Sequence, residues 1–340
     1  WDDVVVKHPK LFTACIAVLS MSLGACGIHL ESSATHLPAL TGFALSRDAS
    51  ARTEAAAAQR AHSLAALASE CSSCASSLEA LAQSSQQRLD FLGGVWDPWK
   101  DQENTANLPQ PEEVAEAPYT IEEFISWLVI SARRDLRAAS NPTTSSPEQS
   151  RQLSAVALGR YASAVQLAQA YAIDIDAGDQ GVDALAQRFT QATGATPNWL
   201  VRQGASSDLT LPQVSQTTSA FSSSDEAAAS TASWDCIAQT LPKSAVHTAD
   251  FYEAETIENA LLDRASRSLE RGSKDSRQLR CSLTNTSPSD LAQASLRADV
   301  NLLQSDSQDV RLFGVQAALD DLRLWAGAPT VTFPAVVTLQ

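Results

Sequence analysis

Four cysteines in the body of this 340-residue chain carry its most informative chemistry: Cys71, Cys74, Cys236 and Cys281. The first two are separated by two residues, and the last two lie 45 positions apart. Two further cysteines lie in an apolar amino-terminal stretch. An even number of body cysteines in an exported chain predicts two disulfides, for which three pairings exist.

The surroundings of the first pair favour bridges to distant segments. Ala49 to Leu92 contains no proline or glycine and is rich in alanine, which predicts one long central helix. Its apolar residues recur at steps of three and four, which puts both cysteines on one inward face. Cβ vectors three residues apart in mid-helix diverge. We therefore expect one of Cys71 and Cys74 to pair with Cys236 and the other with Cys281, each bridge contributing about 4–5 kcal/mol.

The sequence favours structural disulfides over three other roles for these thiols. A redox-active Cys71–Cys74 pair needs an exposed, electropositive position, usually at a helix start, which the predicted mid-helix position disfavours. A zinc site would use four thiolates, but no histidine lies at ligand spacing. Covalent c-type haem is excluded because Ala75 follows Cys74 where that motif requires histidine. We expect neither a metal nor a cofactor.

The amino terminus indicates export. Lys7 and Lys10 precede an uncharged apolar run from Leu11 to Ala25, which is typical of a secretory signal and short for a membrane-crossing helix. An alternative is an uncleaved signal anchor extending through Leu30.

The run ends in Leu23-Gly24-Ala25-Cys26, and here the chain resembles bacterial lipoproteins of the actinobacterial type. That resemblance implies that the Cys26 thiol carries a diacylglycerol and that the bond before it is cut. Residues 1–25 would then be the signal peptide and residues 26–48 a tether, rich in small and polar residues. The lipid would anchor the protein to the cell membrane at its extracytoplasmic face.

The balance of charge restricts the partners. The chain has 39 acidic and 24 basic residues, a net charge of −15, and removal of residues 1–25 leaves that value unchanged. Such a surface repels phosphate backbones, so we expect no nucleic-acid partner.

The remaining pattern predicts an all-α fold. We expect a disulfide-stapled bundle of about seven to nine helices around the long central one, forming a single domain over 49–340 with a sub-boundary near 195–223. Thr120 with Glu123 forms a capping box, and Tyr119 against Phe124 a hydrophobic staple.

Further signals mark the later helices. Ser146-Pro147 and Ser287-Pro288 are helix starts, and a helix from about Ser224 should break at Pro242. The tail from Thr330 should lie extended across the bundle. Three arginines predict a solvated helix end: Arg133, Arg134 and Arg137.

The helical pattern over residues 50–330 also looks like a ferritin-like bundle. Di-iron members of that family use glutamates and two Glu-x-x-His pairs. No histidine follows three residues after the glutamates considered, which are Glu122, Glu123, Glu253, Glu255 and Glu258. The resemblance therefore implies the shell of such a bundle without its iron site.

Aromatic residues supply the candidate binding site. Trp96, Asp97 and Trp99 follow Gly93-Gly94 in a loop that either covers the core or contacts a partner, and Trp127 lies in the next helix. Large aromatics are usually buried, which favours a covering loop.

Three functions follow from these features. The first is a lipid-anchored envelope protein that presents a helical surface to another envelope component. The second is a small-molecule or cell-wall ligand-binding lipoprotein with a pocket roofed by Trp96, Trp99 or Trp127. The third is an enzyme, which would need perturbed carboxylates around His247 or the three arginines. No catalytic motif is present, so we do not expect an enzyme.

Overall fold

A computed structural model describes most of the body of the chain. The described residues are 36–68, 71–101, 108–173, 219–245, 251–326, 331 and 333–337. The sequence expectations for Cys26, for His247 and for most of the sub-boundary at 195–223 lie outside these residues. The fold of the described part is all-α, as predicted.

The chain divides into two units by its internal contacts. One unit comprises Trp1–Ala39 and Asp97–Glu112, and the other comprises Leu40–Trp96 and Glu113–Gln340. Every helix below belongs to the second unit. The segment Asp97–Glu112 falls in the first of these units.

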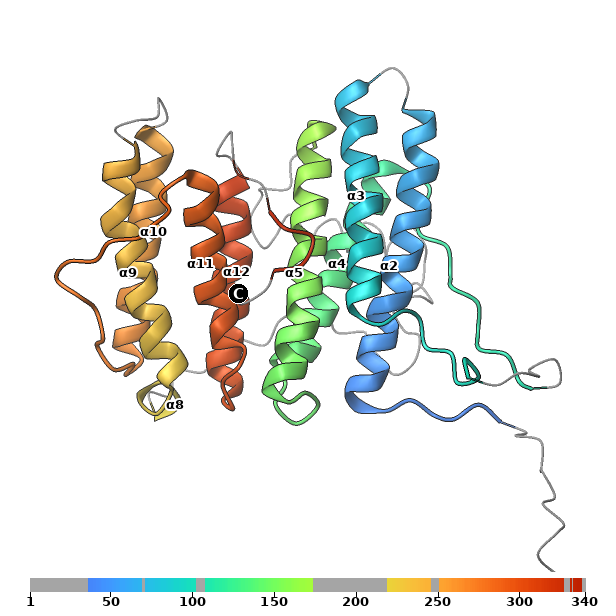
Figure 1. Cartoon of the computed structure of the whole chain (residues 1–340), viewed down its shortest axis with the longest axis horizontal. Coiled ribbons are helices and arrows are strands. Elements are labelled where there is room, and N and C mark those ends of the chain that lie inside the picture. The colour runs from blue at the N-terminus through green and yellow to red at the C-terminus, as the bar shows by residue number, and fades with distance from the viewer. Residues whose placement is uncertain are drawn as a thin grey trace, which may run out of the picture. The chain divides into compact units, whose positions relative to one another are not determined.

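The predicted long helix over 49–92 is two helices, α2 (Gly42–Leu67) and α3 (Ser72–Phe91), which pack side by side as a hairpin (Figure 1). Ala68 ends α2, and Cys71 is the N-cap of α3, its sulfur accepting the backbone N–H of Cys74. A hairpin buries a face of both halves, which one rod of this length would not do. The absence of glycine and proline therefore does not predict an unbroken helix, because a capping residue can end one helix and start another.

α2 also begins earlier than expected. It starts at Gly42, so the carboxyl end of the predicted tether is helical, and Asp48 is buried. Leu67 is one of the apolar residues whose spacing of three and four predicts an inward face, but at the end of the helix it is 79% exposed. The inward face of α2 consists mainly of alanines with a few polar residues, which allows close helix approach.

The next hairpin pairs α4 (Ile121–Ser140) with α5 (Pro147–Ala170). Both predicted starts are confirmed, since Thr120 accepts the N–H of Glu123 and Ser146 forms a capping box with Gln149. The predicted staple is wrong, because Tyr119 is 67% exposed. Its ring instead faces Arg60, whose guanidinium carbon lies 3.6 Å from the ring centroid.

The remaining helices are α8 (Ser219–Ser222), α9 (Asp225–Ala245), α10 (Phe251–Glu270), α11 (Pro288–Leu302) and α12 (Gln308–Ala326). Ser287 caps α11, as predicted. The expected break at Pro242 is wrong, because α9 continues to Ala245. A proline in the last turn removes one backbone hydrogen bond where the helix is about to end anyway.

Two groups of helices, α2–α5 and α8–α12, meet where α5 contacts α11 and α12 (Figure 1). One hydrophobic core runs from α2, α3, α4 and α5 into α11 and α12, and a second is shared among α8–α12. The central position predicted for residues 49–92 thus falls to α5.

The described carboxyl-terminal segment, residues 333–337, lies against α5. The N–H of Val337 donates to Ala155 O at 3.2 Å, and the Val337 side chain is buried. A Cβ at Gly159 would lie 1.9 Å from Ala335 O, so only glycine allows this approach. Of the tail predicted to lie extended across the bundle, residues 333–337 thus contact α5 and Arg88. Over the described residues, no helix combines the length and hydropathy that crossing a membrane requires.

Candidate functional site

The four body cysteines form two local disulfides, Cys71–Cys74 and Cys236–Cys281, with Cα separations of 5.2 and 5.6 Å. The predicted pairing between the two regions is therefore wrong. The reason is the break between α2 and α3. Cys71 is not in mid-helix, and its extended N-cap backbone (φ −125°, ψ 95°) turns the side chain toward Cys74.

The two bridges differ in what they constrain. Cys236–Cys281 ties α9 to the loop after α10 and closes a ring across a sequence separation of 45, which the chain-entropy model values at about 4 kcal/mol. Cys71–Cys74 spans a separation of three, for which the same model gives about 2 kcal/mol. The Cys71–Cys74 bridge therefore holds no distant segments together.

The candidate binding aromatics do not form one site. Trp127 is buried in the core and stacks on Phe124, with ring centroids 6.1 Å apart. Trp99 is buried, and its indole N–H donates to Pro109 O at 2.8 Å. Asp97 accepts the Trp99 backbone N–H, and Trp96 donates its own to Asp48. Trp99 and Trp127 are buried as expected, whereas Trp96 is half-buried and Asp97 is exposed.

The three arginines do not form the predicted solvated helix end. Arg133 is buried, and Arg134 is paired with Asp135 at 2.8 Å and with the Thr53 hydroxyl at 3.1 Å. Arg137 is partly buried. α4 packs against both α2 and α5, so its polar residues are drawn into contacts between helices.

Arg160 of α5 is the centre of a buried group that we name the N-terminal charge cluster: Glu54, Arg88, Asp135 and Arg160. Arg160 Nε donates to Glu54 Oε1 at 2.7 Å, and Nη1 donates to Asp135 Oδ2 at 2.8 Å. All four side chains are at most 1% exposed. One guanidinium therefore joins α2, α4 and α5 deep in the bundle.

Arg88 of α3 completes this cluster. Its Nε lies 2.9 Å from Glu54 Oε2, an ion-pair contact in which the N–H is not aimed along the line joining the atoms. Its other nitrogens donate to the hydroxyls of Ser85 and Ser163 and to Ala335 O. The carboxyl-terminal segment thus contributes a ligand to a buried cation.

Local electrostatics distinguish the two arginines. Burial lowers the pKa of Arg88, and attraction to Glu54 does not fully offset it because Arg160 adds repulsion. Burial also acts to lower the pKa of Arg160, but Glu54 and Asp135 together outweigh it, and the pKa is raised. Two anions around one cation account for the difference.

A second buried group, the C-terminal charge cluster, lies among α9–α12: Trp234, Arg264, Ser295, Asp299 and Asp321. Arg264 Nη1 donates to Asp299 Oδ1 at 3.2 Å, and Nη2 donates to Asp321 Oδ1 at 2.5 Å. The Trp234 indole donates to Asp299 Oδ1 at 2.8 Å, and the Ser295 hydroxyl donates to Asp321. The charged members are at most 3% exposed.

This cluster has more acid than base. Burial raises the pKa of Asp299 well above its ordinary value, repulsion from Asp321 raises it further, and Arg264 opposes both. Oδ2 of Asp299 is buried and has no hydrogen-bond partner among the described residues. That oxygen is the natural position for a proton.

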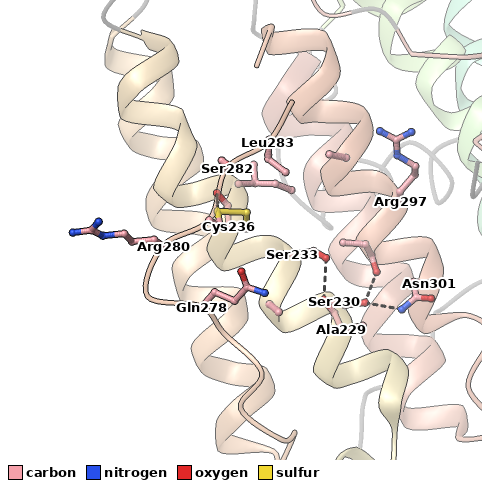
Figure 2. Close-up of a pocket in the computed structure, with 15 residues that line it drawn as sticks. Ala229, Ser230, Ser233, Cys236, Gln278, Arg280, Ser282, Leu283, Arg297 and Asn301 are labelled. Carbon is pink, nitrogen blue, oxygen red and sulfur yellow. Dashed lines mark hydrogen bonds between the residues drawn. A yellow bond between two sulfur atoms is a disulfide. The ribbon is translucent and has the colours of Figure 1, made fainter. Parts of the chain in front are cut away.

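The described part of α9 and α11 borders an open hollow of about 660 Å3 (Figure 2). Small side chains of the two helices and the Cys236–Cys281 disulfide form its walls. Ser230, Ser233 and Asn301 supply polar atoms, while Arg280 points away from the hollow. None of the three predicted tryptophans lines it.

The sequence analysis identified neither charge cluster. A signal for one of them was present. Arg160 is the only charged residue between Arg151 and Asp174, and the residues on either side of it, 153–159 and 161–165, are small or apolar. An isolated arginine in such a helix indicates a buried, paired cation.

No group of three or more His, Cys, Asp and Glu side chains in the described residues is arranged to hold a metal ion. Comparison of the chain with protein-family models, with curated proteins and with solved structures gives no match.

Proposed function

We propose that this protein is a lipid-anchored, extracytoplasmic envelope protein whose helical body binds another envelope component. The observation that supports it best is the use of cysteine. All four body cysteines are paired in disulfides, which are typical of exported proteins, and the lipobox thiol of Cys26 is left to carry lipid.

Metabolic labelling with an alkyne analogue of palmitate tests the anchor. The full-length protein should incorporate the label and fractionate with membranes, and Cys26→Ser should lose both properties. Cys15→Ser is the matched control, because Cys15 lies in the predicted signal peptide, and it should still be labelled. Equal labelling of the Cys26→Ser protein and the unaltered protein would refute the anchor.

Exposed aromatic surface supports a binding role for the body. Tyr119 is 67% exposed, and its position is fixed by Arg60 against the ring and by a hydrogen bond from its hydroxyl to Glu116. Aromatic and arginine side chains contribute strongly to protein interfaces, and a fixed side chain loses little entropy on binding.

A photo-crosslinking amino acid at position 119 tests this surface in the native membrane. The expected product is a discrete adduct with an envelope protein, identified by mass spectrometry. The same amino acid at Gln87, an exposed position on α3, is the control and should give no such adduct. Recovery of the protein alone from position 119 would contradict the interaction role.

A second candidate function, small-molecule binding, is favoured by the hollow at α9 and α11. Its volume lies in the range of ligand pockets, and its walls combine apolar and polar groups. The dye anilinonaphthalene sulfonate should bind there with increased fluorescence, and Ala232→Trp, which fills the hollow, should abolish the signal. Equal fluorescence of the two proteins would show that the hollow is not the binding site.

A further inference from the structure

The Cys71–Cys74 disulfide lies at the first turn of α3, the position at which a C-x-x-C pair has distinctive chemistry. The sequence argument against a redox role placed the pair in mid-helix. The structure removes that objection, since Cys71 is the N-cap of a 20-residue helix. Thiolates at helix N-termini are stabilised by unpaired backbone N–H groups and by the helix dipole.

The two sulfur atoms are in different environments. Cys71 is partly exposed, whereas Cys74 is 3% exposed. Cys71 Sγ accepts the backbone N–H of Cys74 at 3.2 Å and lies 3.4 Å from the Ser73 hydroxyl. An incoming thiolate can therefore reach Cys71 but not Cys74, and a Cys71 thiolate would find hydrogen-bond donors in place.

The reduced form of Cys74 also has a partner in place. Its Sγ lies 3.5 Å from the carbonyl oxygen of Ala170 at the end of α5. After the two sulfurs separate on reduction, a protonated Cys74 thiol has that oxygen within reach as an acceptor. Both members of the dithiol are thus accommodated by the fold that holds the disulfide.

The surface beside Cys71 suits a polypeptide partner. Cys71 N–H donates to Ala68 O, which ties it to the end of α2, and the last residue of α2 is the exposed Leu67. Leu67, four residues before Cys71 in the sequence, gives a partner polypeptide an exposed apolar side chain to contact. The bridge itself joins no distant segments, so it has little structural use.

We propose that Cys71–Cys74 is a redox-active pair that exchanges disulfides with cysteines of other exported polypeptides. A partner thiolate attacks Cys71 Sγ and forms a mixed disulfide, and the S–S bond breaks to release Cys74, which takes up a proton. The second partner thiolate then attacks the partner sulfur of the mixed disulfide and releases Cys71 as a thiolate. Two electrons pass from the partner dithiol to the pair, and the partner gains a disulfide; the reverse sequence reduces it.

A redox titration of the full-length protein tests this proposal, with the second disulfide as an internal control. The protein is equilibrated in graded mixtures of reduced and oxidised glutathione, quenched with acid and alkylated, and each cysteine is quantified by mass spectrometry. Cys71–Cys74 should become reduced in mixtures that leave Cys236–Cys281 oxidised. Resistance of both bridges across the whole range would overturn the proposal.

Single substitutions assign the roles of the two sulfurs. In Cys74→Ser, Cys71 should form a mixed disulfide with glutathione, and its alkylation by iodoacetamide should reach half its maximal rate below about pH 8.5, the value of a free cysteine. In Cys71→Ser, the buried Cys74 should react at least about tenfold more slowly at pH 7. Equal rates in the two variants, or an ordinary titration of Cys71, would contradict the proposal.

Discussion

In the N-terminal charge cluster two carboxylates face two buried guanidiniums, whereas in the C-terminal charge cluster two carboxyl groups face one. Arg160 and Arg264 hold corresponding positions, since each spans two acidic residues from two other helices. In the N-terminal charge cluster, the two positive charges of Arg88 and Arg160 balance the two negative charges of Glu54 and Asp135. The C-terminal charge cluster has Arg264 as its one cation for two carboxyl groups, and burial together with repulsion from Asp321 raises the pKa of Asp299, which favours a proton on that carboxyl.

This difference shows how a helical bundle can bury charge in two ways. A second arginine fixes the balance at every ordinary pH, because guanidinium does not deprotonate. A proton on one of two carboxyl groups needs less space than a second arginine, but it makes the stability of the protein depend on pH. The following predictions test whether the two clusters differ as described.

The largest effect is expected on removal of the cation that holds the N-terminal charge cluster together. Arg160→Met leaves Glu54 and Asp135 buried with reduced compensation and should lower the free energy of unfolding by about 3–5 kcal/mol. Urea denaturation measures this change. Arg277→Met is the control, because its pair with Asp275 is exposed to solvent and should contribute little to stability. Similar losses in the two variants would contradict a special role for Arg160.

A matched pair of aspartate substitutions compares the clusters directly. Asp135→Asn removes a needed anion from Arg160 and should cost about 3 kcal/mol. Asp299→Asn replaces a carboxyl whose raised pKa favours the protonated form, and it should cost less than about 1 kcal/mol. The amide can still accept from Trp234 and Arg264 and can donate to Asp321. Equal costs at pH 7 would show that the two clusters carry their charge in the same way.

A smaller effect is expected where the carboxyl-terminal segment meets the N-terminal charge cluster. Gly159→Ala puts a methyl group on Ala335 O, displaces that acceptor from Arg88, and should cost about 1–3 kcal/mol. A chain that ends at residue 332 provides the control, because without the segment alanine and glycine should differ by less than about 1 kcal/mol in an α-helix. If Gly159→Ala lowers the free energy of unfolding by the same amount in the shortened chain, the loss of stability does not come from contact with Ala335.

Helix type and most helix starts were predictable from the sequence because they depend on local signals. Ser146 and Ser287 each precede a proline and cap a helix in the structure, and Thr120 caps α4. The break at Cys71 was not predictable in the same way. A cysteine is an uncommon N-cap, and the alanine-rich flanks favour helix on both sides.

The charge clusters were less predictable because they depend on contacts between distant segments. Glu54 meets Arg160 across 106 positions and Arg264 meets Asp321 across 57. Periodicity places each of these residues on a helix face, but it does not say which helix will cover that face. The disulfide pairing failed for the same reason, since it relied on the assumed neighbours of one helix.

The sign of the pH dependence follows from the raised pKa of Asp299. The folded chain retains a proton that the unfolded chain loses near its ordinary pKa of 3.8. The contribution of Asp299 to the free energy of unfolding is therefore highest below that value and falls as pH rises, by up to about 1.4 kcal/mol per pH unit, until the folded pKa is passed. Asp275, whose pKa Arg277 lowers to about 2, acts in the opposite sense at acid pH.

The most direct test of a proton on the folded Asp299 carboxyl compares the unaltered protein with Asp299→Asn. The free energy of unfolding of each is measured by urea denaturation from pH 5 to pH 8. The unaltered protein should lose stability relative to Asp299→Asn as pH rises, because only its carboxyl must hold a proton. If the two curves instead run parallel over this range, Asp299 carries no proton in the folded protein and the contrast between the two clusters is wrong.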